Sequence, residues 1–286
     1  MNKFIRFSIL CFTTVAATGC AVLISDRGTE GAEPLTSHAQ AIATEVSTCL
    51  EFLGTPMFPP GQELESDSIS LVSWNVKKGG RPSWRDDLTE LALDRDLVLM
   101  QEAVLTADQN GTPAGMDHWS FAPGYRTAEF LTGVMTYSSA TPLTQCNLTS
   151  REPWLGTPKA TGITEYGLTG TDETLVVVNI HAINFTFGVA AFTAQLEQIG
   201  PILAAHEGPI IFSGDFNTWR NKRVQVLDAF VRDFDLMPVA FEADFRKTVF
   251  GQHLDHIYVR GLTVESSGSR IVETSDHNPL FVDLRL

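Results

Sequence analysis

The feature that most constrains the fold of this chain is a series of eight short apolar runs that begins after Ser68. Most of these runs are rich in β-branched or aliphatic residues and are bounded by Gly, Pro or Asp, as is typical of β-strands. We predict strands at residues 69–75, 97–103, 133–139, 162–168, 174–182, 209–217, 254–262 and 280–286. Helical patterns lie between only some of them, at residues 84–94, 192–203 and 224–234. Neighbouring strands without a helix between them argue against a purely parallel sheet, so the sequence predicts an α/β sandwich with mixed sheets.

The clearest helical pattern places Phe192, Leu196, Ile199 and Leu203 on one face, at spacings of four, three and four residues. Pro201 is expected to kink this helix, because proline removes one backbone hydrogen bond. A further short helix is predicted within residues 37–54. The 286 residues, 43% of them hydrophobic, suit one globular domain.

Polar residues stand at or near the ends of several predicted strands, where apolar burial should stop. They are Asn75, Gln101 with Glu102, His181, Asp215 with Asn217, Asp255, and the pair Asp276 and His277 before the last strand. A single Asp or Asn at such a place is usually a turn former. Together, the carboxylates are ligands that a hard divalent cation prefers, and the imidazoles and amides can donate to a phosphoryl oxygen. This set favours metal-assisted hydrolysis of phosphate esters.

The same segments carry a resemblance to a known family. In order they read "SWNVKKG", "LVLMQEA", "VNIHAIN", "FSGDFNTW", "LDHIYV" and "SDHNPLFVDL". They resemble the endonuclease/exonuclease/phosphatase superfamily, which includes pancreatic-type deoxyribonucleases, apurinic endonucleases, neutral sphingomyelinases and inositol polyphosphate 5-phosphatases. The resemblance runs from about Ser68 to Leu286. It implies a four-layer α/β sandwich with two central mixed β-sheets flanked by helices, and a Mg²⁺ site, with Mn²⁺ as a substitute, where the sheets meet.

The resemblance also implies which residues bind the metal and the substrate. Glu102 matches the principal metal ligand of the family, and Asp276 matches a carboxylate near the metal. Asn75 matches a residue that supports the metal ligand and the phosphate. Lys159 falls where some relatives carry a cation that contacts the phosphate, although it can equally be a surface lysine.

Five further residues match catalytic positions of the family. His181 matches a histidine that donates to the phosphoryl oxygen, and Asp215 with Asn217 matches the pair that orients or deprotonates the attacking water. His277 matches a histidine at the scissile phosphate, and Asp255 the carboxylate that orients it. Such a carboxylate would raise the pKa of the imidazole and fix its tautomer. The sequence leaves open whether Asp215 or His277 accepts the proton of the water.

The chain is acidic, with 20 Lys and Arg against 34 Asp and Glu and a formal net charge of −14. This balance argues against a broad surface for nucleic acid. Seven cations are nevertheless concentrated in two short loops: Lys77, Lys78, Arg81 and Arg85 in one, and Arg220, Lys222 and Arg223 in the other. They are either solvated loop faces or part of a local phosphate site.

The N-terminus "MNKFIRFSILCFTTVAATGC" has the pattern of an export signal. Its end resembles a bacterial lipobox, in which Cys20 would be lipidated. We predict a signal peptide at residues 1–20, a tether and N-terminal extension at 21–67 and the endonuclease/exonuclease/phosphatase domain at 68–286. The expected location is the periplasm or the cell surface, anchored to a bacterial membrane. Ordinary secretion after cleavage and an uncleaved membrane anchor are the alternatives.

An oxidising compartment would permit Cys49 and Cys146 to pair; otherwise they are buried free thiols.

The leading functional hypothesis is an exported metal-dependent phosphoric ester hydrolase, most simply a nuclease acting on DNA or RNA. One alternative keeps the site but changes the substrate to a lipid headgroup, as in a sphingomyelinase, or to a small phosphomonoester. A membrane tether favours the lipid, but no apolar hairpin of the kind that inserts into bilayers is evident in the sequence, so we place it below the nuclease. The second alternative is a non-catalytic lipoprotein scaffold. The sequence does not indicate an oligomeric state.

Overall fold

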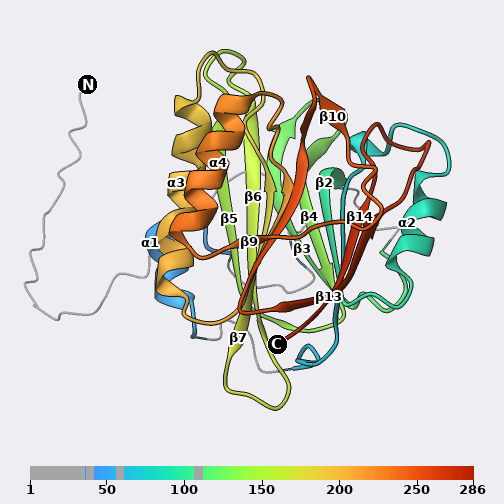
Figure 1. Cartoon of the computed structure of the whole chain (residues 1–286), viewed down its shortest axis with the longest axis vertical. Helices are drawn as coiled ribbons and strands as arrows, with labels where there is room; N and C mark the ends of the chain where they lie inside the picture. Colours follow the sequence, from blue (N-terminus) through green and yellow to red (C-terminus); the bar gives the residue numbers. More distant parts are fainter. Residues whose placement is uncertain (1–35, 37–41, 56–60, 106–111) are drawn as a thin grey trace, which may run out of the picture. The chain divides into compact units, whose positions relative to one another are not determined.

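Two six-stranded sheets form the frame of the chain (Figure 1). The computed structural model describes residue 36 and residues 42–55, 61–105 and 112–286, which belong to one compact unit starting at Glu33. The first sheet has the order β13–β14–β1–β2–β4–β3, with β1 (Ile69–Asn75), β2 (Leu97–Leu105), β3 (His118–Arg126), β4 (Leu131–Ser138), β13 (Thr263–Ser269) and β14 (Leu280–Arg285). The second has the order β5–β6–β7–β8–β12–β9, with β5 (Pro142–Arg151), β6 (Pro158–Gly167), β7 (Thr174–His181), β8 (Ile210–Asp215), β9 (Met237–Pro238) and β12 (Asp255–Arg260). A small hairpin joins β10 (Thr248–Val249) and β11 (Gln252–His253).

The two sheets pack face to face and are covered by helices on their outer sides. Leu71 and Leu97 of the first sheet meet Val177 and Ile211 of the second in one buried cluster. The outer face of the second sheet packs against α1 (Val46–Phe52), α3 (Ala190–Ala205) and α4 (Asn221–Asp233), and that of the first against α2 (Trp84–Ala92). Figure 1 shows the two groups of helices on opposite sides of the sheets. The predicted four-layer α/β sandwich is confirmed.

Each sheet is mixed, because it contains one parallel pair among antiparallel ones. β1 pairs in parallel with β2 and β7 with β8. A parallel pair needs a crossover connection, and α2 and α3 supply these two. Asn75 therefore stands opposite Gln101 in the first sheet, and His181 opposite Asp215 in the second. The predicted polar strand ends are thus placed side by side within each sheet.

The eight predicted strands are all present, with ends that shift by a few residues. The sequence analysis missed β3, β5 and β13, and also the two-residue strands β9, β10 and β11. β3 contains Pro123 and Gly124, and its pairing with β4 shifts register after Pro123. β13, with the sequence TVESSGS, is a polar edge strand whose first four residues are exposed. The alternation of apolar and polar residues by which a strand is recognised is limited to HWSF in β3 and QCNLT in β5, and β13 lacks it.

The predicted helices are present, and α3 shows the expected apolar stripe. Phe192, Leu196, Ile199 and Leu203 are all fully buried against the second sheet. The helix continues through Pro201. Pro201 and Glu197, the residue four positions earlier whose carbonyl loses its partner, are both exposed to solvent. Water can satisfy that carbonyl, so the proline is tolerated there.

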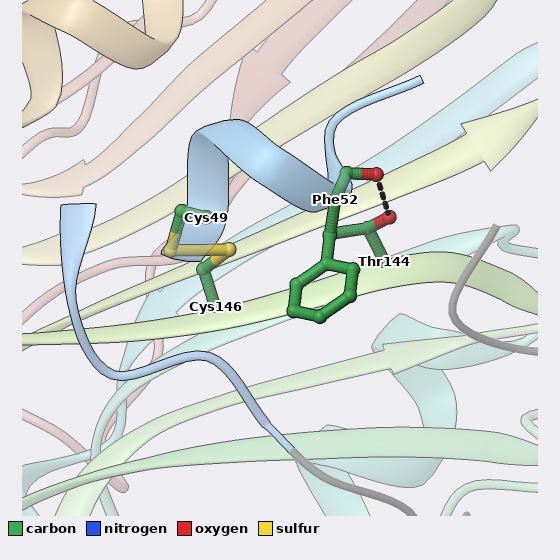
Figure 2. The surroundings of a disulfide bond; sticks show 4 residues. All are labelled: Cys49, Phe52, Thr144 and Cys146. Carbon is green, nitrogen blue, oxygen red and sulfur yellow. Dashed lines mark hydrogen bonds between the residues drawn. A yellow bond between two sulfur atoms is a disulfide. The ribbon is translucent and has the colours of Figure 1, made fainter. Parts of the chain in front are cut away.

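A disulfide ties α1 to the second sheet (Figure 2). Cys49 of α1 is bonded to Cys146 of β5, with a Cα–Cα distance of 5.8 Å. Beside it, the Thr144 hydroxyl donates to the carbonyl of Phe52 at 3.1 Å. The pairing that the sequence left open is therefore present, and the bond closes a long loop, which restricts the unfolded chain.

The predicted signal peptide and most of the predicted tether lie outside the described residues. Of the described part of residues 21–67, Ala43 bridges to Cys146 and Leu64 to Leu168. The boundaries at 1–20, 21–67 and 68–286 stay predictions. Within the described ranges, every helix is too short or too polar to span a lipid bilayer.

Candidate active site

The site lies where the polar ends of strands from both sheets meet, and Asp215 is its centre. One oxygen of this buried carboxylate accepts a hydrogen bond from the Asn75 amide at 2.9 Å, which joins the two sheets. The other accepts the backbone N–H of Asn217 at 2.9 Å. The Nε2 atoms of His181 and His277 lie 3.7 and 4.0 Å from Asp215 Oδ2. Burial raises the pKa of Asp215 to about 6, against the opposing effect of His277.

The turn after β8 gives Asp215 and Asn217 these positions. At Gly214, with φ +147°, an ideal Cβ would lie 2.0 Å from the Ile180 carbonyl oxygen, so no larger residue fits between β7 and β8. Asn217 has φ +50°, and its side-chain amide donates to the Ala182 carbonyl at 3.1 Å. Asn217 therefore holds Asp215 in place while being anchored to the end of β7.

His277 and Asp255 form a buried imidazole–carboxylate pair. Nδ1 of His277 lies 2.8 and 3.0 Å from the two oxygens of Asp255. The loop that carries His277 is fixed by Ser275, whose hydroxyl accepts the His277 N–H at 3.2 Å, and by the Trp74 indole, which donates to the His277 carbonyl at 3.0 Å. Burial lowers the pKa of His277, but the charges of Asp255 and Asp215 outweigh it and raise this pKa to about 10. His277 is therefore a cation at neutral pH, with Nε2 directed toward Asp215.

His181 is the second imidazole near Asp215 Oδ2, and it is paired with a lysine. Lys159 Nζ, on β6, is 3.0 Å from His181 Nε2. Burial, together with the charges of Lys159 and His277, lowers the pKa of His181 well below its usual value, so this imidazole is neutral. Burial also lowers the pKa of Lys159, although Glu152, Asp215 and Glu102 oppose the shift. The alternative that Lys159 is a surface lysine is wrong, because its side chain is only 13% exposed.

Glu102 enters the site from a β-bulge. The pairing of β2 with β4 shifts register between Met100 and Ala103, and Glu102 has φ +51°. Its carboxylate lies 3.1 Å from Lys78 Nζ and 3.9 Å from His181 Nε2. Four of the eight described non-glycine residues with positive φ belong to this site, namely Lys77, Lys78, Glu102 and Asn217. Such backbone strain gathers at functional sites.

The residues predicted to hold the metal divide between two places. Glu102 and Asp276 are partly exposed, and each faces a lysine: Lys78 at 3.1 Å and Lys77 at 3.0 Å. Carboxylate oxygens are donors that a hard divalent cation prefers, and each of these two already attracts a positive charge. Asn75 does not share their contacts, because its amide binds Asp215 and its oxygen accepts the backbone N–H of Lys77 at 3.0 Å.

A second group of donors lies deeper. Asp215, Asp255 and His277 offer ligand atoms within 4.8 Å of one another, and all three residues are buried. This group could also hold a metal ion, and its mixed oxygen and nitrogen donors would suit Mn²⁺ or Zn²⁺ as well as Mg²⁺.

Several of the clustered cations hold loops together. The Arg81 guanidinium donates to the carbonyl of Ser275 at 3.2 Å, behind the loop of His277. Arg220 donates to the carbonyls of Thr186 and Gly188, both at 3.0 Å, and the buried Arg223 donates to that of Ile183. These three arginines therefore give no support to a phosphate site built from both loops, because each guanidinium donates to backbone carbonyls. Lys77 and Lys78 do point into the site.

The sequence analysis missed Glu152, at the start of the turn between β5 and β6. This carboxylate is 2% exposed, and its Oε1 accepts the N–H groups of Asn184 and Phe185 at 2.9 and 3.2 Å. The same oxygen lies 4.0 Å from Lys159 Nζ. Glu152 thus connects the loop after β7 to the buried lysine, and no motif around it signals this role.

A pocket of about 580 Å³ opens beside these groups. Glu102, His181 and Lys159 line its inner wall, and Tyr125, Leu155 and Phe185 line its outer wall. The pocket thus offers a charged, hydrogen-bonding end for a phosphate group and an apolar end for whatever the phosphate is attached to.

Comparison with known proteins agrees with this fold. The UPF0294 protein of Klebsiella pneumoniae (strain 342) is 39% identical over 236 residues, which cover 80% of this chain and 87% of that protein. Two solved structures share the fold. The mannosyl-6-phosphatase Bt3783 of Bacteroides thetaiotaomicron VPI-5482 has a TM-score of 0.58 and 17% identity, and covers 76% of this chain and 100% of its own. D. rerio TDP2 with a single-strand DNA product has a TM-score of 0.54 and 17% identity, and covers 77% of this chain and 99% of its own.

A model of the Endonuclease/Exonuclease/phosphatase family matches residues 72–277. The chain therefore belongs to the endonuclease/exonuclease/phosphatase family.

Proposed function

We propose that this chain is a Mg²⁺-dependent phosphodiesterase that hydrolyses phosphate esters by attack of a water molecule. The observation that carries the proposal is the position of Asp215, a buried carboxylate between two imidazoles at the meeting point of both sheets. Family membership supports the reaction class. The two structural relatives support no single substrate, since one is a phosphatase and the other was solved with DNA.

Asp215 is the better candidate for the group that accepts the proton of water. With a pKa raised to about 6, its carboxylate is ionised at neutral pH yet still basic enough to take a proton. His277 is already protonated there, because Asp255 and Asp215 raise its pKa to about 10 in spite of burial. His277 would therefore act as a donor, stabilising charge on the phosphoryl oxygens or protonating the leaving oxygen.

Other groups of the site supply position and charge. Lys159 and the neutral His181 lie together on the wall of the pocket, where they would donate to phosphoryl oxygens. Asn217 would keep the Asp215 carboxylate oriented through its backbone N–H. Glu102 and Asp276 would hold the metal, with the group of Asp215, Asp255 and His277 as the other place for it. A bound divalent ion would supply positive charge to the phosphate.

We further propose that the protein is an exported lipoprotein, anchored through Cys20 to a bacterial membrane and facing the periplasm or the outside. The N-terminal signal pattern supports this. The Cys49–Cys146 bond is of the kind that persists in oxidising compartments. Expression with a labelled fatty acid, comparing wild type with Cys20→Ser, tests the anchor; equal labelling of both would contradict it.

Nucleic acid is the simplest substrate. One argument for it, the clustering of cations in two loops, is weakened by the structure, because Arg81, Arg220 and Arg223 bind backbone carbonyls. A specific observation favours the second candidate, a phosphodiester lipid. The turn between β5 and β6 exposes Trp154 and Leu155, at 57% and 62%. The sequence analysis did not single out this exposed apolar tip, and it supports the lipid alternative.

The deciding experiment is a substrate panel on the purified full chain. Bis(p-nitrophenyl) phosphate, plasmid, single-stranded DNA, sphingomyelin vesicles and a phosphomonoester would be compared with Mg²⁺, Mn²⁺ or chelator. We expect hydrolysis of at least one diester, lost with chelator and in Asp215→Asn. A chain that hydrolyses none of them under any metal condition, while a related enzyme is active in the same buffers, would contradict the proposal and favour a scaffold.

A further inference from the structure

Four large apolar side chains are exposed at the mouth of the candidate active site. Trp154 and Leu155 lie on the turn between β5 and β6, and Phe185 and Phe187 lie on the loop that leads from β7 into α3. Their exposed fractions are 57%, 62%, 59% and 79%. We call these four residues the apolar rim. A contiguous apolar surface of this kind marks an interaction site rather than ordinary solvent-facing surface.

The apolar rim is held in a fixed arrangement. The rings of Trp154 and Phe187 contact each other, with centroids 3.8 Å apart. The buried Glu152 accepts the N–H of Phe185 at 3.2 Å, and Arg220 donates to the carbonyl of Thr186 at 3.0 Å. These bonds fix both loops, so binding a partner would cost little ordering of the backbone.

The apolar rim is continuous with the catalytic pocket. Leu155 and Phe185 line the outer wall of that pocket, and both also line a neighbouring hollow of about 430 Å³ together with Trp154, Phe187 and Trp219. A surface that covers the rim therefore lies directly against the entrance to Glu102 and His181. The partner would bring its phosphate groups to the site in the act of docking.

The charges that flank the apolar rim are of one sign. In the three segments 150–159, 183–188 and 218–223, the exposed charged residues are Arg151 and Lys222, whereas Arg220 is half-buried and donates to the carbonyls of Thr186 and Gly188. The other charged residues of these segments, Glu152, Lys159 and Arg223, are largely withdrawn from solvent. A basic margin in a chain of net charge −14 is complementary to an anionic surface.

We propose that the apolar rim docks on the surface of a phospholipid bilayer that contains anionic lipid, and that the phosphodiester entering the pocket is a lipid headgroup. Its apolar side chains would enter the boundary between headgroups and acyl chains, and the basic margin would contact the anionic headgroups. Single-stranded nucleic acid fits less well, because the four side chains offer only one hydrogen-bonding group, the indole N–H of Trp154, for reading bases. The headgroup half of this inference rests on the proposed function, whereas the docking half does not.

The first test measures docking without activity. The full chain is mixed with vesicles of phosphatidylcholine and phosphatidylglycerol that carry brominated acyl chains, which quench nearby tryptophan fluorescence. We expect Trp154→Phe to remove most of the lipid-dependent quenching, and the control Trp84→Phe, on α2, to leave it unchanged. Because the full chain keeps its N-terminus, tethering alone would bring all variants to the vesicle without quenching Trp154. Equal quenching in the two variants, or none in wild type, would overturn the docking proposal.

The second test links docking to turnover. The double variant Trp154→Ser with Phe187→Ser should hydrolyse phosphodiester lipids in vesicles roughly tenfold more slowly, as expected from losing two aromatic side chains that docking would partly bury in the bilayer. Its hydrolysis of soluble bis(p-nitrophenyl) phosphate should match that of wild type. Leu93→Ser, at an equally exposed apolar position (65%), is the matched control.

Quenching without hydrolysis of any diester would leave docking established and the proposed function wrong. Loss of DNA cleavage in the double variant, without quenching in wild type, would show that the rim stacks on bases and overturn membrane docking.

Discussion

The candidate site has two halves that differ in how their charges are held. In the buried half, Asn75, Asp215, Asp255 and His277 are between 2% and 7% exposed. In the outer half, Lys77, Lys78, Glu102 and Asp276 have side chains that are 46%, 45%, 23% and 36% exposed. The buried half is a network in which backbone and side-chain bonds fix each polar group, whereas the outer half consists of two ion pairs near solvent.

The difference indicates a division of labour. Buried polar groups that are fully bonded are preorganised, and they stabilise charge without having to reorient. Partly exposed lysine–carboxylate pairs contribute only about 0–1 kcal/mol, so a ligand can break them at little cost. We infer that the buried half positions the reacting groups, while the outer half exchanges its lysine contacts for a cation or a phosphate when these bind.

The largest expected effect is the loss of turnover in His277→Ala, which breaks the buried half. Removing the imidazole eliminates the proposed donor and leaves Asp255 without its partner. We expect kcat for a soluble diester to fall by roughly 10²- to 10⁴-fold. The control is His253→Ala, whose imidazole is half-exposed and contacts Asp244. Equal losses in the two variants would show that His277 has no special role.

The next effect concerns stability and its dependence on pH. Burial raises the pKa of Asp215 from 3.8 in the unfolded chain to about 6, so the folded state binds this proton more tightly. The resulting stabilisation is fully present below about pH 4 and is lost as the pH rises through about 6. The Asp215→Asn variant keeps this stabilisation at every pH, because its side-chain amide is neutral and does not ionise. In chelator at about pH 7, we expect this inactive variant to unfold with a free energy up to about 3 kcal/mol higher than wild type.

The measurement for Asp215→Asn is denaturant unfolding at about pH 7 and about pH 3.5. The gain should vanish at the lower pH, where Asp215 in wild type is protonated in both states. A variant that is less stable than wild type at pH 7 would mean that the hydrogen bonds of the carboxylate outweigh the cost of burying its charge. The buried half would then stabilise the fold rather than weaken it.

A smaller effect is expected at Glu152, which supports Lys159 from outside both halves. Glu152→Gln keeps an oxygen that accepts the N–H groups of Asn184 and Phe185 but removes the negative charge near Lys159. The pKa of this buried lysine should fall further, so the alkaline limb of the pH–rate profile should move to lower pH. At about pH 8 we expect a loss of roughly threefold to tenfold in turnover. Unchanged profiles, with a loss only in Glu152→Ala, would assign Glu152 a purely structural role.

The sequence predicted the buried half well for a physical reason. Strand ends are where an apolar run meets polar residues, and period and register place these ends together. Asp215 and His181 are opposite each other because β7 and β8 are parallel, and Asp255 is opposite Asp215 because β12 is antiparallel to β8. Neither fact depends on long side chains or on loop conformations, so the pattern of strand ends grouped these residues, and the family resemblance indicated which of them meet.

The parts that could not be predicted depend on contacts between distant loops. Glu152 gains its role only because the loop at Asn184 comes to lie over it. The apolar rim combines two pairs of residues, each too short to register as an apolar pattern. The arginines of the second cationic loop bind carbonyls that the chain brings to them from residues 183–188. Residue type left open whether these cations form a solvated loop face or a phosphate site, and the contacts to backbone carbonyls appear only in the folded chain.

The smallest expected effect, at Lys78, sharpens the comparison by locating the metal. Lys78 Nζ lies 3.1 Å from Glu102, so in the outer half the ammonium and the metal would compete for the same carboxylate. Lys78→Met should then lower the Mg²⁺ concentration for half-maximal activity by at most about fivefold, since an exposed pair is worth about 1 kcal/mol or less. Lys77→Met should act likewise through Asp276, and the exposed Lys222→Met is the control.

If instead Asp215, Asp255 and His277 bind the metal, neither site lysine contacts a ligand, and the three variants should need the same Mg²⁺ concentration as wild type. Unchanged metal dependence in Lys77→Met and Lys78→Met would therefore move the metal into the buried half and remove the proposed division of labour.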